Sequence, residues 1–317
     1  MVTFLDFEKP IAELQSRIVD LRDTADSGAI DIDAEVSKLE AKSQRLLRDT
    51  YRKLTPWQKT QVARHPDRPH FRDYVAGMVA DFMPLAGDRA FADDPAIIGG
   101  LGRIGGRRAM VIGHEKGEDT ASRLRHNFGM AKPEGYRKAI RLMQLADRFG
   151  LPVVTLVDTP GAFPGVQAEE RGQAEAIARA TEQCLEIGVP MVAAIVGEGG
   201  SGGAIALAAA NRVVMFEHAV YAVISPEGCA SILWRTPDKI SDAADAMKIT
   251  AADLLRLKVV DRIVEEPLGG AHRDPAAAIA SLEKAIVEQL DALSTENRDT
   301  LRRRRREKFL AVGAIAG

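Results

Sequence analysis

Two successive stretches near the start of the chain carry apolar residues at helical spacing. The first has alternating steps of four and three residues, at Phe7, Ile11, Leu14, Ile18 and Leu21. The second follows the segment 26–29 and carries Val36, Leu39, Leu46 and Leu47. Each set lies on one face of a helix, so residues 4–54 are predicted to form a helical hairpin. The sequence leaves open whether these faces pack on each other, on the rest of this chain or on a partner.

From residue 96 onward, short apolar runs alternate with helical patterns. Residues 96–104 and 108–113 flank Gly105 and Gly106, which predicts a β-hairpin. Residues 133–149 predict an amphipathic helix that ends at Gly150. The other predicted elements are strands at 151–157, 191–196, 212–216 and 220–224, and helices at 168–187, at 204–210 and from Pro226. Because the strands are apolar throughout, they predict an α/β fold with helices on both faces of its sheet.

The stretch from 191 to 210 is the most informative part of the chain. The apolar run 191–196 breaks into Gly197, Gly199, Gly200, Gly202 and Gly203, and then resumes as an alanine-rich helix. Glycine lets a ligand approach the main chain closely, and the first amides of a helix attract negative charge. The pattern therefore predicts an anion-binding site built from main-chain N–H groups.

Two motif matches compete with this interpretation. Residues 100–105 fit the GxGxxG pattern of dinucleotide-binding proteins, but a predicted strand follows where that fingerprint needs a helix. Residues 199–203 fit the GxSxG nucleophile elbow, with Ser201 as the nucleophile. A hydrolase would then draw its acid and base from later residues such as Asp238 and His218 or His272. The glycines outnumber what an elbow needs, so the anion-binding interpretation is favoured and the hydrolase is the alternative.

A second loop has the composition of a shaped ligand-binding segment. Residues 158–165 read Asp-Thr-Pro-Gly-Ala-Phe-Pro-Gly and follow a predicted strand. Its prolines restrict the backbone and its glycines permit close approach. Loops at the carboxyl ends of neighbouring parallel strands share one crevice. We expect N–H groups of Ala162 or Phe163 and of Gly203 or Ala204 to converge on a single oxygen, as in an oxyanion hole.

Composition and charge narrow the class of protein. The chain has 317 residues, 46% hydrophobic content and a formal net charge of −2, which gives no reason to expect nucleic-acid binding. Its two cysteines, Cys184 and Cys229, lie far apart and suggest neither a disulfide framework nor a metal site. The N-terminus does not read as a signal peptide and no membrane span is expected, so we expect a cytoplasmic protein. Residues 302–306 are five arginines, either a solvated helix end or a docking surface for an acidic partner.

Four separated segments resemble a known family. They are the loops 158–165 and 197–203, Phe128-Gly-Met-Ala-Lys-Pro-Glu-Gly-Tyr136, and Ser225-Pro-Glu-Gly-Cys-Ala-Ser-Ile-Leu-Trp234. Together they resemble the α subunits of bacterial acetyl-coenzyme A carboxylase carboxyltransferase, up to about residue 265. The resemblance implies a crotonase (ClpP/crotonase-like) fold, a spiral of ββα units with an N-terminal helical hairpin arm. It divides the chain into the arm (1–55), a carboxyltransferase domain (56–270) and a C-terminal helical segment (271–317).

The resemblance also implies a reaction and a site. The subunit would help move the carboxyl group of carboxybiotin to acetyl-coenzyme A, giving malonyl-coenzyme A for fatty acid biosynthesis. The biotin ureido oxygen would meet the amides of Gly203 and Ala204, with Gly202 adjacent and with Ala162 and Phe163 on the other wall. Many relatives have tyrosine at 163, so the phenylalanine here excludes a catalytic hydroxyl. The remaining carboxybiotin-binding residues implied are Gly161, Gly199, Gly200 and Ser201.

The partners implied by the resemblance explain why one chain would be half an enzyme. A β subunit would complete an α2β2 heterotetramer and supply zinc and most of the coenzyme A site, whereas this chain would hold no metal. Biotin carboxyl carrier protein would present carboxybiotin, and biotin carboxylase would bind ATP in the holoenzyme. Besides the hydrolase, a non-catalytic assembly subunit that works through its helical arm is kept as an alternative.

Overall fold

The computed structural model describes residues 3–26 and 33–313. Within them the strands form one sheet of eight, in the order β1-β2-β3-β4-β5-β6-β8, with β7 paired to the end of β5. The first three strands are antiparallel and the others are parallel. The strands are β1 (Ala80–Pro84), β2 (Ile97–Ile104), β3 (Arg107–His114), β4 (Val153–Thr159), β5 (Met191–Gly200), β6 (Arg212–Phe216), β7 (Val220–Ala222) and β8 (Arg262–Val264).

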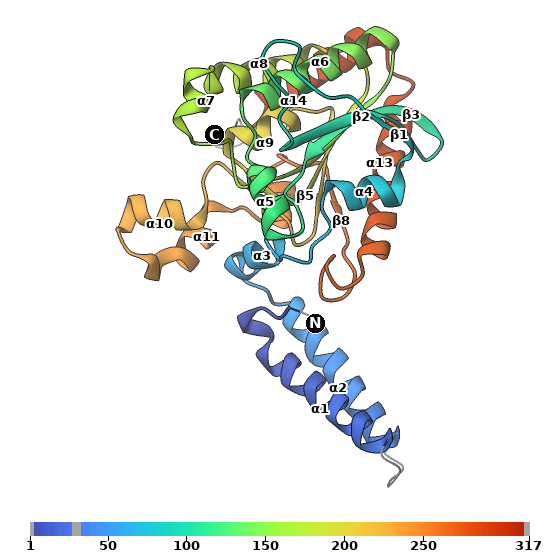
Figure 1. The fold of residues 1–317 in the computed structure, drawn as a ribbon, viewed down its shortest axis with the longest axis vertical. Coiled ribbons are helices and arrows are strands. Elements are labelled where there is room, and N and C mark those ends of the chain that lie inside the picture. The colour runs from blue at the N-terminus through green and yellow to red at the C-terminus, as the bar shows by residue number, and fades with distance from the viewer. Residues whose placement is uncertain (1–2, 27–32, 314–317) are drawn as a thin grey trace.

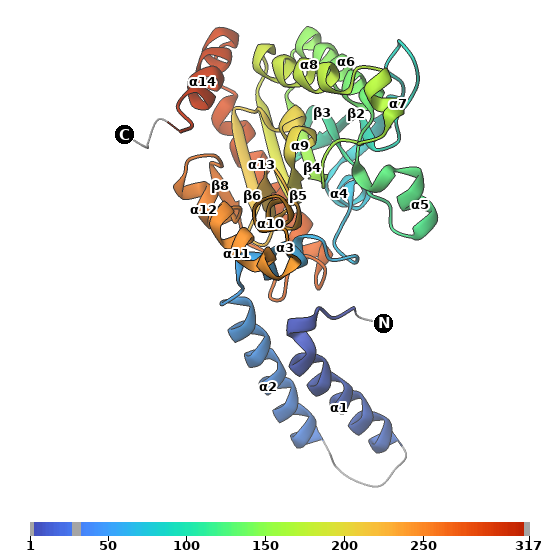
Figure 2. The same cartoon turned by 90° about the vertical axis from the view of Figure 1, so that its left-hand side faces the viewer.

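Helices cover both faces of the sheet, as the apolar strands predict (Figure 2). One face is covered by α6 (Pro133–Phe149), α8 (Gln173–Glu186) and α9 (Ser201–Ala208), and the other by α4 (Phe71–Met78) and α13 (Pro275–Leu293). The central strands β4 and β5 are buried along their whole length. The expectation of an α/β fold is therefore confirmed.

The N-terminal hairpin projects from this body (Figure 1). It consists of α1 (Lys9–Asp26) and α2 (Asp33–Tyr51), and its apolar stripes face each other, because Leu14 and Ile18 cluster with Val36 and Leu39. Its base is fixed to the body through the short helix η1 (Asp6–Glu8). There the buried Glu8 carboxylate accepts from Tyr51 at 3.0 Å and pairs with Arg273 at 2.6 Å.

Several predicted boundaries are corrected by the structure. The β-hairpin and the helix at 133–149 with its Gly150 cap are found as expected, with φ of 67° at Gly150. The predicted helix 168–187 is two helices, α7 (Val166–Glu170) and α8, because Gly172 adopts φ of 81° between them. Four shorter helices complete the body around β7 and β8: α3 (Pro56–Ala63), α10 (Pro226–Trp234), α11 (Ile240–Met247) and α12 (Ala251–Arg256).

Candidate functional site

The chain passes from β5 into α9 through a sharp turn at Ser201. Residues 197–200, predicted to be a loop, continue the strand, and α9 begins at Ser201 rather than at 204. Gly199 lies in the sheet between Thr159 of β4 and Tyr221 of β7. Ser201 is exposed and has φ of 50°, a left-handed conformation that is uncommon outside glycine. Backbone strain of this kind concentrates at functional sites.

The loop after β4 lies directly against this turn. A Cβ atom on Gly200 would come within 2.2 Å of the Pro160 carbonyl oxygen, and one on Gly203 within 2.7 Å of the Gly161 carbonyl carbon. Since such approaches are sterically forbidden, both positions require glycine. The Thr159 hydroxyl fixes the loop by donating to the Gly161 carbonyl at 2.7 Å. The structure thus brings together the two segments that the sequence analysis placed in one crevice.

Within the loop, the Phe163 amide is already used. It donates to the Ala131 carbonyl at 3.0 Å, so the expectation that Phe163 offers a free amide is wrong. The side chain of Gln173 reinforces this contact by donating to the carbonyls of Ala131 and Phe163, at 2.8 and 3.0 Å. The Phe163 ring lies 5.1 Å from the Lys132 ammonium. The Ala162 amide makes no hydrogen bond within the described residues and is left as the donor of this wall.

In α9, the start of the helix decides which amides are free. The first turn of an α-helix has no intrahelical partners for its N–H groups. In a helix that begins at Ser201, this leaves the amides of Gly202 and Gly203 unpaired, whereas the Ala204 amide reaches the Gly200 carbonyl. The geometry therefore favours Gly202 and Gly203 over Ala204 as the donors facing the loop.

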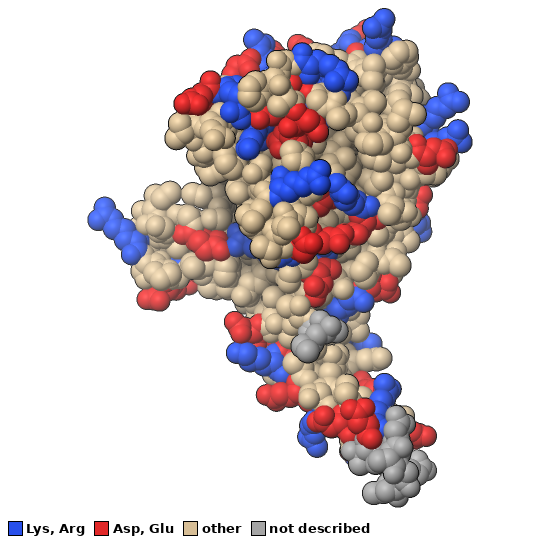
Figure 3. All heavy atoms as spheres, in the orientation of Figure 1, with Lys and Arg blue, Asp and Glu red and all other residues tan. Residues whose placement is uncertain are grey.

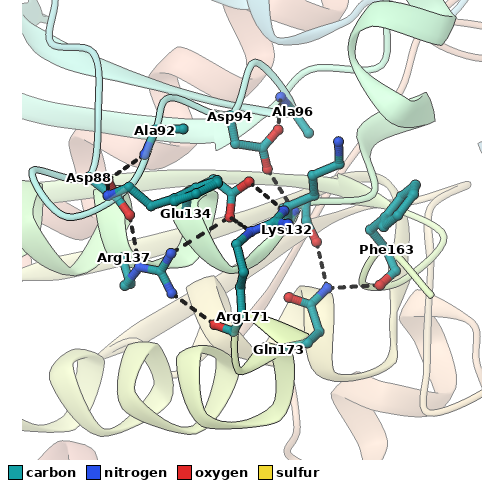
Figure 4. A network of polar contacts seen from close by, with 12 residues as sticks. Asp88, Ala92, Asp94, Ala96, Lys132, Glu134, Arg137, Phe163, Arg171 and Gln173 are labelled. Atoms are coloured by element: carbon teal, nitrogen blue, oxygen red, sulfur yellow. Dashed lines mark hydrogen bonds and ion pairs between the residues drawn. The ribbon is translucent and has the colours of Figure 1, made fainter. Parts of the chain in front are cut away.

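A polar network supports the loop from behind (Figure 4). The Asp94 carboxylate accepts from the amides of Ala96 and Lys132 at 3.0 and 2.7 Å, which fixes the start of α6. Glu134 on the first turn of α6 pairs with Arg171 at 2.9 Å and so ties α6 to the segment between α7 and α8. Both carboxylates are buried, so these contacts rigidify the surroundings of Phe163.

A neighbouring carboxylate anchors the connection between β1 and β2. Asp88 accepts from the amides of residues 90–92 at 2.8–3.0 Å and from Arg137 at 2.8 Å. Although burial opposes ionisation, these donors lower the pKa of Asp88 to about 2. No sequence motif marks Asp88 or Asp94, and the partners that tie them to α6, the Arg137 side chain and the Lys132 amide, lie 49 and 38 residues further along the chain.

Charged and titratable side chains lie at the ends of β3 and β4. Asp158 pairs with Lys116 at 2.5 Å and accepts from the Glu198 amide at 2.9 Å, linking β3, β4 and β5 at one edge. His114 is buried, and neither of its ring nitrogens has a hydrogen-bond partner in the described part of the chain. Burial lowers the pKa of His114 to about 4, so its ring is neutral near pH 7.

The residues needed by a serine hydrolase do not meet. His218 packs edge-on against Tyr51 of the arm, with ring centroids 5.5 Å apart. His272 stacks on His65 at 3.8 Å, and Asp238 lies in a surface turn after α10. None of the three is hydrogen-bonded to Ser201 among the described residues. The elbow-like backbone is present, but these residues do not form a catalytic triad with Ser201, so this part of the hydrolase hypothesis is wrong.

The arginine run lies on α14 (Arg298–Leu310) and is largely a solvated helix end, one of the two expected alternatives, but it contains a buried exception. Arg305 of α14 is fully buried. It donates to the carbonyls of Ile187 and Val189 at 2.8 and 2.9 Å, to that of Cys184, and to the Asn211 side chain. It therefore closes the C-terminal end of α8 against the sheet, while Arg303 and its exposed neighbours face solvent.

Other features limit the chemistry of the described residues. Cys184 is buried, and burial raises the pKa of its thiol to about 12. Within residues 3–26 and 33–313, no group of three or more His, Cys, Asp or Glu side chains could hold a metal ion. None of the helices in those ranges combines the length and apolar character needed to cross a membrane.

Comparison with known proteins identifies relatives of this chain. Residues 4–313 match the family described as "Acetyl co-enzyme A carboxylase carboxyltransferase-like". The acetyl-coenzyme A carboxylase carboxyl transferase subunit alpha of Rhizorhabdus wittichii is 77% identical over 313 residues, covering 99% of this chain and 100% of the relative. The protein of the same name from Zymomonas mobilis is 69% identical over 313 residues, again 99% of this chain and 100% of the relative.

Solved structures share the fold at low sequence identity. Transcarboxylase 12S, with methylmalonyl-coenzyme A and methylmalonic acid bound, superposes with a TM-score of 0.59 at 22% identity over 73% of this chain. The match spans 42% of that protein, so this chain corresponds to less than half of its length. A chain of the Pseudomonas malonate decarboxylase MdcD-MdcE hetero-dimer superposes with a TM-score of 0.56 at 16% identity, over 69% of this chain and 89% of that one. These likenesses confirm the expected crotonase-like fold.

Proposed function

This chain belongs to the acetyl co-enzyme A carboxylase carboxyltransferase-like family, and we propose that its two facing segments bind the carboxybiotin side of the reaction. Its function is that of the carboxyltransferase subunit alpha, an enzyme component that works with a beta subunit. The contact between Gly203 and the loop at Gly161 carries the proposal, because it brings the start of α9 against the Ala162 nitrogen, which lies 3.0 Å from where a Cβ of Gly203 would stand. The expected reaction moves the carboxyl group of carboxybiotin to acetyl-coenzyme A, giving malonyl-coenzyme A.

The reaction needs stabilisation of negative charge more than it needs a side-chain nucleophile. It breaks the bond between the biotin N1 and the carboxyl carbon, forms a bond from that carbon to the acetyl methyl carbon, and moves one proton from acetyl to biotin. Negative charge develops on the ureido oxygen and on the thioester oxygen along the way. Amides of Gly202, Gly203 and Ala162 would hold one such oxyanion without reorganisation. Each such donor contributes roughly 10²–10³ in rate.

In this proposal, the side chains around the crevice between the loop 158–165 and α9 hold the main chain in place. They do not take part in proton transfer. Asp158 is committed to Lys116 and to the Glu198 amide, and His114 is neutral and buried. Ser201 keeps no base within hydrogen-bond reach among the described residues. Its place in the mechanism is therefore to turn the chain, so that the first amides of α9 face the loop. Gly200 leaves room for the Pro160 carbonyl and Gly199 for the Tyr221 ring, whereas Gly161 has φ of 151°, a conformation that residues with a side chain rarely adopt.

The partner surface is proposed to include the lobe formed by α10 and α11. The lobe projects from the body, and in Figure 3 much of it carries no charged side chains. Val223, Ile232, Leu233 and Trp234 are 41–82% exposed there, and apolar patches of this kind mark interaction sites. We assign the patch to the beta subunit. The remaining expectations stay predictions: an α2β2 stoichiometry, zinc in the beta subunit, interaction with the biotin carrier protein and with biotin carboxylase, and a cytoplasmic location.

Reconstitution from purified chains tests the proposal. The chain alone should not carboxylate acetyl-coenzyme A, and addition of the beta subunit with carboxybiotin should restore malonyl-coenzyme A formation. Robust transfer by the isolated chain would overturn the division of the site between two subunits. Ile232→Ser together with Trp234→Ser should weaken assembly measured by light scattering, while Leu310→Ser, which alters an even more exposed side chain on α14, should not.

A further inference from the structure

A small cavity lies at the carboxyl ends of β3 and β4 and reaches Asp158 and Pro160, at the start of the loop after β4. Its volume is about 190 Å³. The lining residues that matter for its chemistry are Arg64, Arg68, His70, Lys116, Arg123 and the carboxylate of Asp158. Drug-sized ligands occupy pockets of roughly 300–1,000 Å³, so this cavity fits one small group or one end of a larger molecule. We refer to it as the Arg123 cavity.

Arg123 supplies the cavity with a positive charge that forms no direct ion pair in the described part of the chain, although the Asp119 carboxylate interacts with it electrostatically. Its guanidinium donates only to the carbonyls of Gly117 and Pro66, both at 3.3 Å, and makes no ion pair with any described residue. The other cations that line the cavity are already paired: Arg64 with Glu198 and Glu227, Arg68 with Glu266, and Lys116 with Asp158, so the one lining carboxylate is neutralised as well. Guanidinium groups match the planar or forked oxygens of carboxylates and phosphates.

His70 adds unused hydrogen-bonding capacity to the same wall. It precedes α4 and is 7% exposed, yet neither ring nitrogen has a partner within the described residues. Only its main chain is engaged: the amide donates to the Asp73 carboxylate at 2.7 Å, and the carbonyl accepts from the amides of Asp73 and Tyr74 at 3.0 and 3.2 Å. Buried polar atoms are nearly always hydrogen-bonded, so the unsatisfied ring nitrogens are free to bond to whatever occupies the cavity. His70 also lines a larger cavity between α4 and α13, but the rim of that cavity is acidic, with Asp67, Asp73, Glu118 and Glu283.

A strained turn forms the outer edge of the Arg123 cavity. Three successive residues, Asn127, Phe128 and Gly129, have φ of 48°, 55° and 80°. Gly129 is held against the main chain of Asp158, since a Cβ there would come within 2.9 Å of its carbonyl oxygen. The turn leaves the Phe128 ring 45% exposed at the cavity edge. Strain of this kind persists where the surroundings enforce it, commonly at ligand sites.

We propose that the Arg123 cavity binds a phosphate-type oxyanion, held by the Arg123 guanidinium and a ring N–H of His70. The cavity opens at the same edge of the sheet as the amide segments, where α/β proteins bind ligands. Its size suits a single phosphate. This phosphate comes either from the solution or from a coenzyme A thioester, whose phosphates share the same chemistry. The proposal concerns this chain alone and does not depend on the assignment of the carboxybiotin side.

Calorimetric titration of the full chain with inorganic phosphate tests the proposal without any carboxyl transfer. Arg123→Gln and His70→Phe, which removes both nitrogens and keeps a ring, should each weaken phosphate binding about tenfold or more. Arg125→Gln is the matched control, because Arg125 lies exposed on the same helix, α5 (Thr120–Arg125), and does not line this cavity. Its affinity should stay within about twofold of the unaltered chain.

The outcomes separate site binding from general attraction. Absence of phosphate binding up to millimolar concentration, or equal weakening by Arg125→Gln and Arg123→Gln, overturns the proposal. Thermal unfolding checks that each variant folds. If His70→Phe does not fold, the phosphate affinity of Arg123→Gln decides the test by itself. Displacement of bound phosphate by coenzyme A but not by its dephospho form identifies the 3′-phosphate of the coenzyme as the source. Displacement by both forms identifies its pyrophosphate, and displacement by neither identifies free phosphate.

Discussion

At Gly203 the lack of a side chain is what lets two distant segments touch. The main chain of residue 161 occupies the place where a Cβ would stand, 2.7 Å away. Glycine at 202 is under no such demand, since a Cβ there would meet only the Ile177 side chain at 3.3 Å. The difference between neighbouring glycines allows the role of the contact to be tested.

Gly203→Ala should therefore reduce carboxyl transfer by about 10²–10³, because the Gly161 loop must move away and the amides no longer converge. Gly202→Ala keeps its amide and should lose much less. Steady-state malonyl-coenzyme A formation by the reconstituted enzyme measures both, with circular dichroism to confirm folding. Equal losses in the two variants would mean that the contact at Gly203 does not shape the site.

A substitution at Ser201 distinguishes the carboxyltransferase from the competing hydrolase hypothesis. Ser201→Ala should leave carboxyl transfer within about tenfold of the unaltered enzyme, because the turn depends on its backbone and no base is hydrogen-bonded to its hydroxyl. Ester hydrolysis by the isolated chain, abolished by the same substitution, would instead restore the hydrolase hypothesis. Both rates can be measured on one preparation.

At the scale of elements, α14 docks through a single buried cation. Arg305 holds carbonyls at the end of α8 and before β5, so removal of its guanidinium strands several buried acceptors. Arg305→Met should lower the free energy of unfolding by about 3 kcal/mol or more. Arg303→Met on the same helix should change it by less than about 0.5 kcal/mol. Urea unfolding compares them, and equal effects would deny Arg305 this role.

The elements also show where sequence patterns are sufficient. The apolar stripes of α1 and α2 predicted their helices, and the Gly105–Gly106 and Gly150 signals predicted a hairpin turn and a helix end. The same reasoning placed the start of α9 too late, because the glycines at 197–200 continue strand β5. It also joined α7 and α8 into one helix, because it did not recognise that Gly172 breaks the helix. A glycine can either continue a strand or interrupt a regular element, and its local sequence does not distinguish the two. At 197–200, pairing with β4 and β7 decides for the strand.

For the whole molecule, acid sensitivity should begin well above the pKa values of carboxylates. His114 is buried and neutral, whereas in the unfolded chain it takes up a proton near pH 6.5. Unfolding therefore binds a proton between pH 6.5 and about 4, and stability falls as pH falls through this window. One proton contributes a slope of about 1.4 kcal/mol per pH unit. His114→Gln should reduce the slope of unfolding free energy by about this amount in urea titrations.

A second loss should follow at lower pH. Although burial raises the pKa of Glu266, its pairing with buried Arg68 at 2.7 Å lowers it to about 2. The stability contributed by this pair is present above pH 4.5 and is lost as pH falls toward 2. The two windows do not coincide, so an unchanged slope above pH 4.5 in His114→Gln would contradict the role of His114.

The sequence by itself determined the α/β class, the helical arm and the two segments of the candidate site, because periodicity and glycine content are local properties. It did not find the long-range contacts of Asp88, Asp94 and Gln173, which reach Arg137, Lys132 and Ala131 in other segments. Only the tertiary structure decided which amides are free, taking Phe163 out of the donor set and burying Arg305. The physical reason is that a donor is free only if no acceptor packs against it, and the packing of the whole chain determines which acceptors lie near each donor.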